Sequence, residues 1–422
     1  MRINASRNGC SGYLHRWLSC AKVSLAGRRS AVVDRCSQGD RMESMQLKPP
    51  VGLLQSGGLS SLAVAVWLAE QSIPSHQFVA HIGQSTQADI DRLVVSLQRS
   101  GAGVTVVDLR DRMAEVAADL LRYYARHDGG YWNTTGAARY VLVSELAPQL
   151  HAEGYGTLAH GCVGGGNDER RFARYTVTHA PELEVYAPWA DPKALARFPD
   201  RAAMAKAVVD HDLYLDVGSG VDRSTDANVA GISHESAELE DLTVPATRLQ
   251  PRWSRWPADA AAGPELVTVT FAAGRVIDVN GSGPRPLDWM TVSNDLGARQ
   301  GIWLRDVVER RIIGTVCRGV YEAPGLEVLD RAWTKMLEVS LDAERRALYD
   351  QLARVCGAAM YSARWIDRSA ASARSAIDQL VADVTGRVSL AVHRGVITVT
   401  GVEAASELVQ QTRFGSGGNR WN

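Results

Sequence analysis

Apolar residues between positions 51 and 160 fall into short runs that alternate with longer, helix-like segments. Residues 51–55 form an apolar run, the turn Ser56-Gly57-Gly58 follows, and residues 59–70 have the composition of a mostly buried helix. The pattern then predicts strands at 77–82, 104–108 and 155–160, and helices at 89–99, 110–124 and 137–152. Alternation at this spacing is typical of a parallel sheet with helical crossovers, so we expect a doubly wound α/β nucleotide-type domain.

Beyond about residue 210 the pattern changes to hairpins and long helices. Residues 266–271 and 276–279 flank a short turn and predict a hairpin, and residues 312–318 predict another strand. Residues 326–360 and 377–384 are expected to be helical, and residues 387–393 and 396–400 to form a closing hairpin. These elements indicate an α+β second domain.

Composition narrows the classes of partner. The 46 basic and 47 acidic side chains give a net charge of −1, so the chain has no global attraction for nucleic acid or an anionic membrane. No apolar run approaches the roughly 20 residues that span a bilayer. The six cysteines form no CxxC pair and have no histidine at metal-ligand spacing, which argues against a zinc site or a disulfide scaffold. We expect a cytoplasmic protein with no metal site of its own.

Residues 1–46 differ from the rest of the chain. Up to Val33 they contain no acidic residue, and they show no sustained periodicity. An acid-poor segment of this kind could be a transit peptide. The preferred interpretation is a start codon placed too far upstream, because Met42 and Met45 stand just before the first strand.

The turn Ser56-Gly57-Gly58 joins a strand to a helix, an arrangement that directs backbone N–H groups and the positive end of the helix at one spot. Such a spot suits an anion such as phosphate. The turn is neither a Walker A loop nor a GxGxxG motif. A second glycine-rich turn, residues 161–168, follows the strand at 155–160, and both turns lie where open parallel sheets bind ligands.

Longer motifs are more specific than either turn. They are LLQSGGLSSLAVAVWL at 53–68, FVAHIGQ at 78–84, YWNTTGAAR at 131–139, AHGCVGGGNDERRFARY at 159–175, PELEVYAPWAD at 181–191, RSTDANVAGISHES at 223–236 and VVERRIIGTVCRGVYEAPG at 307–325. In this order they resemble argininosuccinate synthase, in its bacterial form, over roughly residues 51–400.

The resemblance implies an ATP pyrophosphatase-type nucleotide domain at 47–210, a synthetase domain at 211–360 and a C-terminal oligomerisation arm at 361–422 of a homotetramer. It also implies a reaction that joins citrulline, or an analogue, to aspartate, or an analogue. ATP is cleaved to AMP and pyrophosphate, with Mg²⁺ bound mainly through ATP. The ureido oxygen first attacks the α-phosphate, and the aspartate amine then displaces AMP, so the protein mainly aligns groups and stabilises charge.

The phosphate loop departs from the family pattern, which usually reads SGGLDTS. Ser60 stands at the acidic position, and Leu62 stands where the family has a serine, so a carboxylate near magnesium and a hydroxyl near the phosphates are missing. The backbone cradle remains. The nucleotide-binding positions implied by the family are Leu54, Gln55, Ser56, Gly57, Gly58, Leu59, Ser60, Ser61, Leu62, Ala80, Gly161 and Asp226.

On the citrulline side the expected residue types are retained. Arg171 can bind a carboxylate through its fork, and Glu235 and Glu309 suit an ammonium group or ureido N–H groups. The full set of implied positions is Tyr131, Asn167, Arg171, Ser224, Ser233, Glu235, Glu309 and Tyr321.

The aspartate side is mixed. Thr135, Asn167 and Asp168 fit the family, and Asp168 is placed to hold the attacking ammonium group. Val163, however, replaces a threonine and offers no hydrogen bond, and Gly165 replaces a lysine. The catalytic positions predicted from the resemblance are Asp168, Arg171 and the altered Ser60.

These departures leave alternatives open. A paralogue could adenylate a different ureido- or carboxyl-bearing amino acid, because the citrulline side is intact and the aspartate side is altered. A catalytically impaired paralogue could instead bind nucleotide or amino acid without turnover. A more distant alternative is another ATP pyrophosphatase, such as a tRNA-modifying enzyme, but the chain shows no basic surface for RNA.

Overall fold

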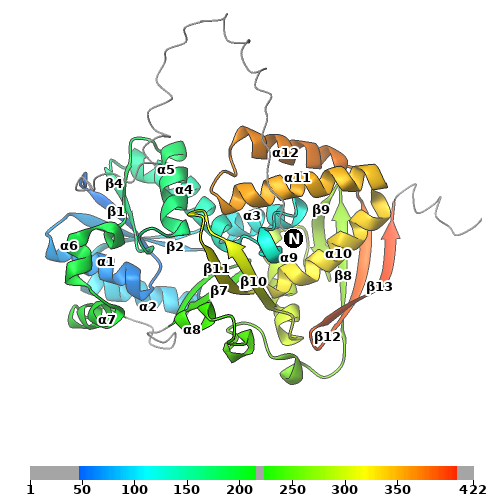
Figure 1. Ribbon diagram of the computed structural model, residues 1–422, viewed down its shortest axis with the longest axis horizontal. Helices are drawn as coiled ribbons and strands as arrows, with labels where there is room; N and C mark the ends of the chain where they lie inside the picture. The colour runs from blue at the N-terminus through cyan, green and yellow to red at the C-terminus, as the bar shows by residue number, and fades with distance from the viewer. Residues whose placement is uncertain (1–46, 215–222, 406–422) are drawn as a thin grey trace, which may run out of the picture. The chain divides into compact units, whose positions relative to one another are not determined.

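The computed structural model describes residues 47–214 and 223–405, which belong to one compact unit, Met45–Asn422 (Figure 1). The leader expected at 1–46 lies outside the described residues. The first sheet contains β1 (Val51–Gln55), β2 (Ser75–His81), β3 (Gly103–Asp108), β4 (Thr157–His160) and β5 (Glu184–Tyr186). Its order is β3-β2-β1-β4-β5, and all its pairs are parallel. The prediction of a doubly wound parallel sheet is therefore confirmed.

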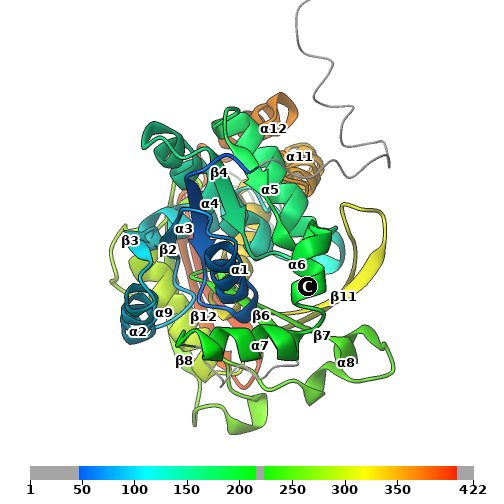
Figure 2. The same ribbon diagram turned by 90° about the vertical axis from the view of Figure 1, so that its left-hand side faces the viewer.

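Helices cover both faces of this sheet because its strands have apolar side chains on both faces. Val51 and Leu53 pack with one group of helices, whereas Leu54 and Leu158 pack with the other. Figure 2 shows α1 turned toward the viewer, on the face opposite α4. The helices of the first group are α1 (Leu59–Glu70), α2 (Gln87–Arg99), α6 (Pro192–Arg197) and α7 (Arg201–Asp210); those of the second are α3 (Arg110–Arg122), α4 (Thr134–Ala152) and α5 (Asn167–His179).

Two antiparallel sheets follow in the sequence. One has the order β10-β11-β7-β6, and we call it the site sheet; the other has the order β13-β12-β8-β9. The site sheet contains β6 (Arg223–Asn228), β7 (Gly231–Ser236), β10 (Leu304–Arg310) and β11 (Val316–Glu322). The other contains β8 (Glu265–Ala272), β9 (Arg275–Val279), β12 (Gly386–His393) and β13 (Val396–Ala404). Both predicted hairpins thus form, and they join through the pairing of β8 with β12.

The remaining helices are α8 (Ala237–Glu240), α9 (Pro286–Arg299), α10 (Pro324–Ser340), α11 (Ala343–Tyr361) and α12 (Arg368–Leu380). Two sequence predictions need correction. The strand predicted at 312–318 begins only at Val316, because the backbone turns at residues 311–315: the Arg311 N–H donates to the Thr315 carbonyl at 2.7 Å, and Gly314 has a φ of +88°. The helix predicted at 377–384 ends at Leu380.

No helix in the described ranges is both long and apolar enough to cross a bilayer.

Candidate functional site

The two glycine-rich turns meet at the carboxyl ends of β1 and β4. A Cβ atom on Gly161 would lie 2.7 Å from the backbone nitrogen of Ser61 and 2.8 Å from its Cα atom, so only glycine permits this approach. The Gly161 carbonyl accepts a hydrogen bond from the Trp189 indole at 3.1 Å. The two glycine-rich turns therefore lie in direct contact at Gly161 and Ser61.

Side chains of the phosphate loop already bond to its backbone. The Gly57 N–H donates to Gln55 Oε1 at 3.0 Å, and the Gly58 N–H donates to Ser56 Oγ at 3.3 Å. The Ser61 hydroxyl contacts Gln55 Oε1 and the Gly58 carbonyl. Gly58 itself caps α1 without a side-chain acceptor, so the first turn of this helix keeps N–H groups for an anion.

Three predicted nucleotide-binding residues have side chains in the hydrophobic core. Leu54, Leu59 and Leu62 are 7%, 7% and 0% exposed, so only their backbone groups are available to a ligand. Leu62 offers no hydroxyl to a phosphate, and its side chain packs with residues of β1 and α1. Ser60 follows the buried Leu59 in the sequence and is itself half-buried. Ala80 is buried near the end of β2.

Register brings the predicted residues of the site sheet onto one face. Asp226 pairs with Ser233, which pairs in turn with Tyr321, and residues directly opposite each other share a face. Glu235 lies two positions after Ser233, and Glu309 pairs with a residue four positions before Tyr321, so both lie on the same face. Ser224 occupies the position opposite Glu235, and its side chain lies outside the described residues. All six predicted positions on this sheet thus share one face.

A charged cluster connects this face to α4 and α5. Arg139 on α4 donates to Asp168 at 3.0 Å and to Asp226 at 2.6 Å, and Arg171 donates to Asp168 at 2.7 Å. Burial opposes ionisation of Asp168, but the charges of Arg139 and Arg171 outweigh it and hold the pKa of Asp168 below its usual value. Burial raises the pKa of Asp226, and Arg139 offsets that effect only in part.

The structure therefore brings Asp168 and Arg171 together, and Asp168 already has two guanidinium partners. Arg171 has one nitrogen to spare: Nη2 is buried and has no hydrogen-bond partner among the described residues. A buried guanidinium N–H in this position is suited to an anionic group of a substrate.

The cluster also affects Glu235. Surrounding protein atoms, together with the negative charges of Asp168 and Asp226, raise the pKa of Glu235 from 4.5 to about 7, although part of its side chain is exposed. The folded protein then holds a proton that the unfolded chain releases above about pH 4.5. Stability contributed by this group consequently falls as the pH rises from 4.5 to 7.

Replacing Glu235 by glutamine removes this titration. We expect Glu235→Gln to raise the melting temperature at pH 8 and to change it little at pH 4, as measured by thermal unfolding across that range. Glu238→Gln, which neutralises an exposed glutamate on α8, is the matched control and should leave the pH profile unchanged. A Glu235→Gln profile parallel to that of the wild-type protein would contradict the assignment.

The predicted citrulline residues surround a buried carboxylate. Glu309 is 5% exposed, and its Oε2 accepts a hydrogen bond from the Tyr321 hydroxyl at 3.1 Å. The rings of Tyr321 and Tyr131 stack with centroids 4.0 Å apart. The Tyr131 hydroxyl accepts from the Thr135 N–H at 2.9 Å, which places Thr135 beside this group. A buried carboxylate with tyrosine donors and no basic hydrogen-bond partner among the described residues suits a substrate rich in N–H groups.

Sequence analysis missed Tyr361, at the end of α11. Its hydroxyl donates to Glu309 Oε1 at 2.9 Å, and the Tyr361 hydroxyl oxygen itself accepts from Asn167 Nδ2 at 2.9 Å. A single tyrosine at the end of an amphipathic helix gives no sequence signal of function. Arg139 belonged to a quoted motif, but its contact with both aspartates depends on the fold.

The predicted aspartate side offers few polar groups. Val163 is 72% exposed, and a Cβ atom on Gly165 would meet nothing within 4 Å, so the loop is open here. The Gly165 N–H donates to the Glu169 carboxylate. The loop thus presents an apolar side chain and an acidic one where the resemblance implies binding of a carboxylate.

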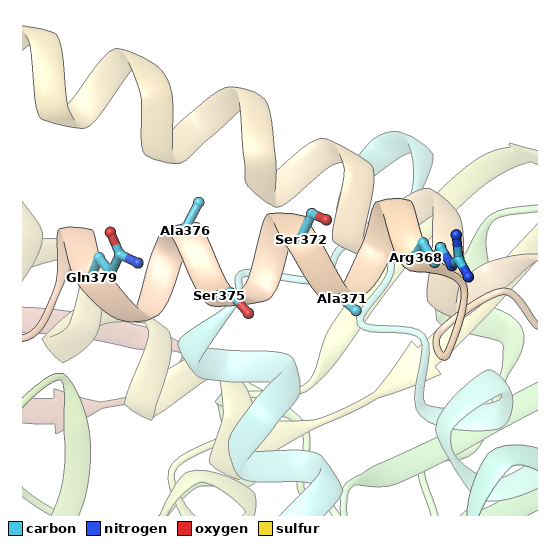
Figure 3. A pocket seen from close by; sticks show the side chains of 6 residues that line it. All are labelled: Arg368, Ala371, Ser372, Ser375, Ala376 and Gln379. Carbon is cyan, nitrogen blue, oxygen red and sulfur yellow. The ribbon is translucent and has the colours of Figure 1, made fainter.

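A hollow lies along α12 (Figure 3). It is shallow, and small or flexible side chains line it. They are Arg368, Ala371, Ser372, Ser375, Ala376 and Gln379. None of the predicted site residues is among them.

We compared the chain with solved structures and with protein families, and only the family matches are strong. The crystal structure of a predicted subunit of tRNA methyltransferase from Methanocaldococcus jannaschii is 15% identical over 38% of this chain and 75% of that chain, with a TM-score of 0.26, which supports no argument. The arginosuccinate synthase N-terminal HUP domain matches residues 50–206, and the arginosuccinate synthase C-terminal domain matches residues 223–416. Both domains of one enzyme occur here in order, and the chain belongs to the argininosuccinate synthase family.

Proposed function

We propose that the protein is an ATP-dependent ligase that joins citrulline to aspartate through an adenylated ureido group, with release of AMP and pyrophosphate. The observation that best supports this activity is the arrangement on the site sheet. Six positions from four strands share one face, and Arg171 and Asn167 of α5 adjoin it. We further propose that the protein works as a homotetramer in the cytoplasm, as the resemblance implies.

Citrulline has an α-carboxylate, an α-ammonium group and a ureido end, and each has a complementary group in this arrangement. The free Nη2 of Arg171 suits the carboxylate, whereas Glu309 suits N–H donors. Glu235, Ser233 and Asp226 lie along the same face and are available to the rest of the substrate. The residues therefore fit a zwitterionic amino acid with a polar end.

The first turn of α1 and the close contact of Gly161 with Ser61 support ATP binding at the adjoining turns. ATP supplies the adenylyl group when bound. The backbone N–H groups would hold phosphate oxygens, and Mg²⁺ would be bound mainly by ATP, because Ser60 offers a hydroxyl and no charge. Among the described residues, no group of three or more His, Cys, Asp or Glu side chains is arranged to hold a metal ion.

Two observations favour a second candidate, a family member with impaired turnover or a different amine donor. Gln55 and Ser56 already accept hydrogen bonds from the glycine N–H groups of the phosphate loop. Near the expected aspartate, the loop also presents the apolar side chain of Val163 and the carboxylate of Glu169. Assaying pyrophosphate release with ATP, citrulline and a panel of amines, aspartate included, distinguishes the two candidates.

Ser60→Asp tests the altered loop directly. We expect it to raise the rate of pyrophosphate release roughly tenfold, because a carboxylate beside magnesium and the phosphates stabilises charge that develops as pyrophosphate leaves. ATP affinity should change little. Ser60→Asp should not be combined with Leu62→Ser, although the family has a serine there. A serine at the fully buried position 62 would leave a cavity and a buried hydroxyl.

Ser60→Asn is the matched control, because it has the same shape without the charge. An aspartate variant no faster than the asparagine variant would show that the loop does not limit turnover. Absence of pyrophosphate release from the wild-type protein and from Ser60→Asp with every amine would contradict the proposed ligase activity.

A further inference from the structure

Tyr361 contacts three residues of the proposed citrulline site from a helix that none of the sequence motifs includes. Its hydroxyl bonds to Glu309 and Asn167, each at 2.9 Å, and its carbonyl accepts from Arg171 Nε at 2.9 Å. The Arg171 guanidinium carbon lies 4.8 Å from the centre of its ring. The ring of His127 also stacks on Tyr361, with centroids 3.5 Å apart.

The hydrogen bonds around this hydroxyl have a fixed direction. The Ile312 N–H donates to Asn167 Oδ1 at 2.9 Å, which leaves the Asn167 amide N–H to donate to Tyr361. The Tyr361 hydroxyl must then donate its single proton to Glu309. Burial and the negative charge of Glu309 raise the pKa of Tyr361, so the hydroxyl keeps that proton.

The hydrogen bonds from Asn167 to Tyr361 and from Tyr361 to Glu309 orient one oxygen of the Glu309 carboxylate, and Tyr321 orients the other oxygen. Glu309 Oε1 accepts from Tyr361 and Glu309 Oε2 from Tyr321, so the plane of the carboxylate is fixed by two donors on different elements. A carboxylate fixed in this way does not have to be ordered when a substrate binds, which saves conformational entropy.

We propose that Tyr361 is a positioning residue for the amino-acid substrate, acting through Glu309 and Asn167. This inference rests on the proposed function. Packing alone does not account for the residue, because phenylalanine would keep the ring contacts with His127 and Arg171, whereas only the hydroxyl completes the directed series of hydrogen bonds.

Tyr361→Phe tests the proposal because it removes the hydroxyl and keeps the ring. We expect the dissociation constant for citrulline, measured by calorimetry on the full chain, to rise roughly tenfold or more, as for loss of a hydrogen bond to a charged group. The dissociation constant for ATP should stay within about twofold. If Tyr361 had a purely structural role, Tyr361→Phe would weaken the binding of both citrulline and ATP, or of neither.

Tyr349→Phe is the matched control on the same helix. The Tyr349 hydroxyl is buried, accepts from the Trp333 indole at 2.9 Å and donates to the Arg122 carbonyl at 2.9 Å, away from the site. This variant should lose stability but keep its citrulline affinity. If Tyr361 acts through Glu309, adding Tyr361→Phe to Glu309→Gln should weaken binding much less than it does in the wild-type protein.

Failure of the wild-type protein to bind citrulline would overturn the proposed function and the role of Tyr361 with it. Citrulline binding by the wild-type protein with unchanged affinity in Tyr361→Phe would overturn the role of Tyr361 alone. Tyr361→Phe would also overturn this role if it weakened citrulline binding and ATP binding equally. The same holds if its effect on citrulline binding were simply additive with that of Glu309→Gln.

Discussion

Replacing Arg139 by methionine is expected to destabilise the protein by about 3–5 kcal/mol, as measured by urea unfolding near pH 7.5. Arg139 bonds to Asp168 and Asp226 at once, and only 12% of its side chain is exposed. Methionine keeps much of the volume and removes the charge. The two carboxylates would then lie close together in partly buried surroundings, where Asp226 loses the only basic hydrogen-bond partner that it has among the described residues.

A half-exposed arginine supplies the control. Arg112 also contacts two acids, Glu115 at 2.9 Å and Glu145 at 3.0 Å, but 35% of its side chain is exposed. Solvent screens such pairs, so Arg112→Met should cost no more than about 1 kcal/mol. Equal losses of stability in the two variants would show that the cluster of Arg139 with two aspartates is not a special determinant of stability.

The parallel domain was predictable because its sequence pattern is local. An apolar run followed by two glycines and a helix defines β1 and α1, whose predicted bounds, 51–55 and 59–70, are confirmed. By contrast, α5 was not predicted, because its sequence NDERRFARYTVTH has few apolar residues to show a helical stripe. It begins directly after the glycine-rich turn and brings Asp168 and Arg171 to the site.

The pattern around Leu62 contained information that a position-by-position comparison overlooked. Leu59, Leu62, Ala63 and Val66 recur at helical spacing, which predicts a buried stripe along α1. Leu62 belongs to that stripe, so its side chain is expected to face the core even though the family has a serine at this position. The same lesson applies to the site sheet, where Ser224 and Asp226, like Ser233 and Glu235, are separated by two positions, as expected for one face of a strand.

Contacts between segments that are distant in the sequence could not be predicted from it. Tyr361 meets Asn167 across a separation of 194 residues, and Arg139 meets Asp226 across 87. No local periodicity connects such positions. The family motifs identified one member of each pair as a site residue, but the partner that orients or neutralises it could be identified only from the folded chain.

Arg171→Ala is expected to reduce citrulline affinity at least a hundredfold, enough to abolish the rise in melting temperature that citrulline should cause in the wild-type protein. Arg171 is 3% exposed and bonds to Asp168 and to the Tyr361 carbonyl, and its buried Nη2 has no hydrogen-bond partner among the described residues. Alanine therefore removes the proposed carboxylate donor and also leaves Asp168 with one guanidinium partner instead of two. Binding is best measured by calorimetry, with thermal unfolding as the check that the variant is folded.

Arg174→Ala is the control for this substitution, because Arg174 lies one turn further along α5 and is exposed. The same loss of charge there should leave citrulline binding within about twofold of the wild-type value, since an exposed charge is screened by solvent and salt. ATP binding separates a local effect from a general one: the phosphate loop lies on other elements, so folded Arg171→Ala should bind ATP with nearly wild-type affinity. Citrulline binding that persists in Arg171→Ala would place the amino acid elsewhere and remove the basis for assigning Glu309 and Tyr321 to its recognition.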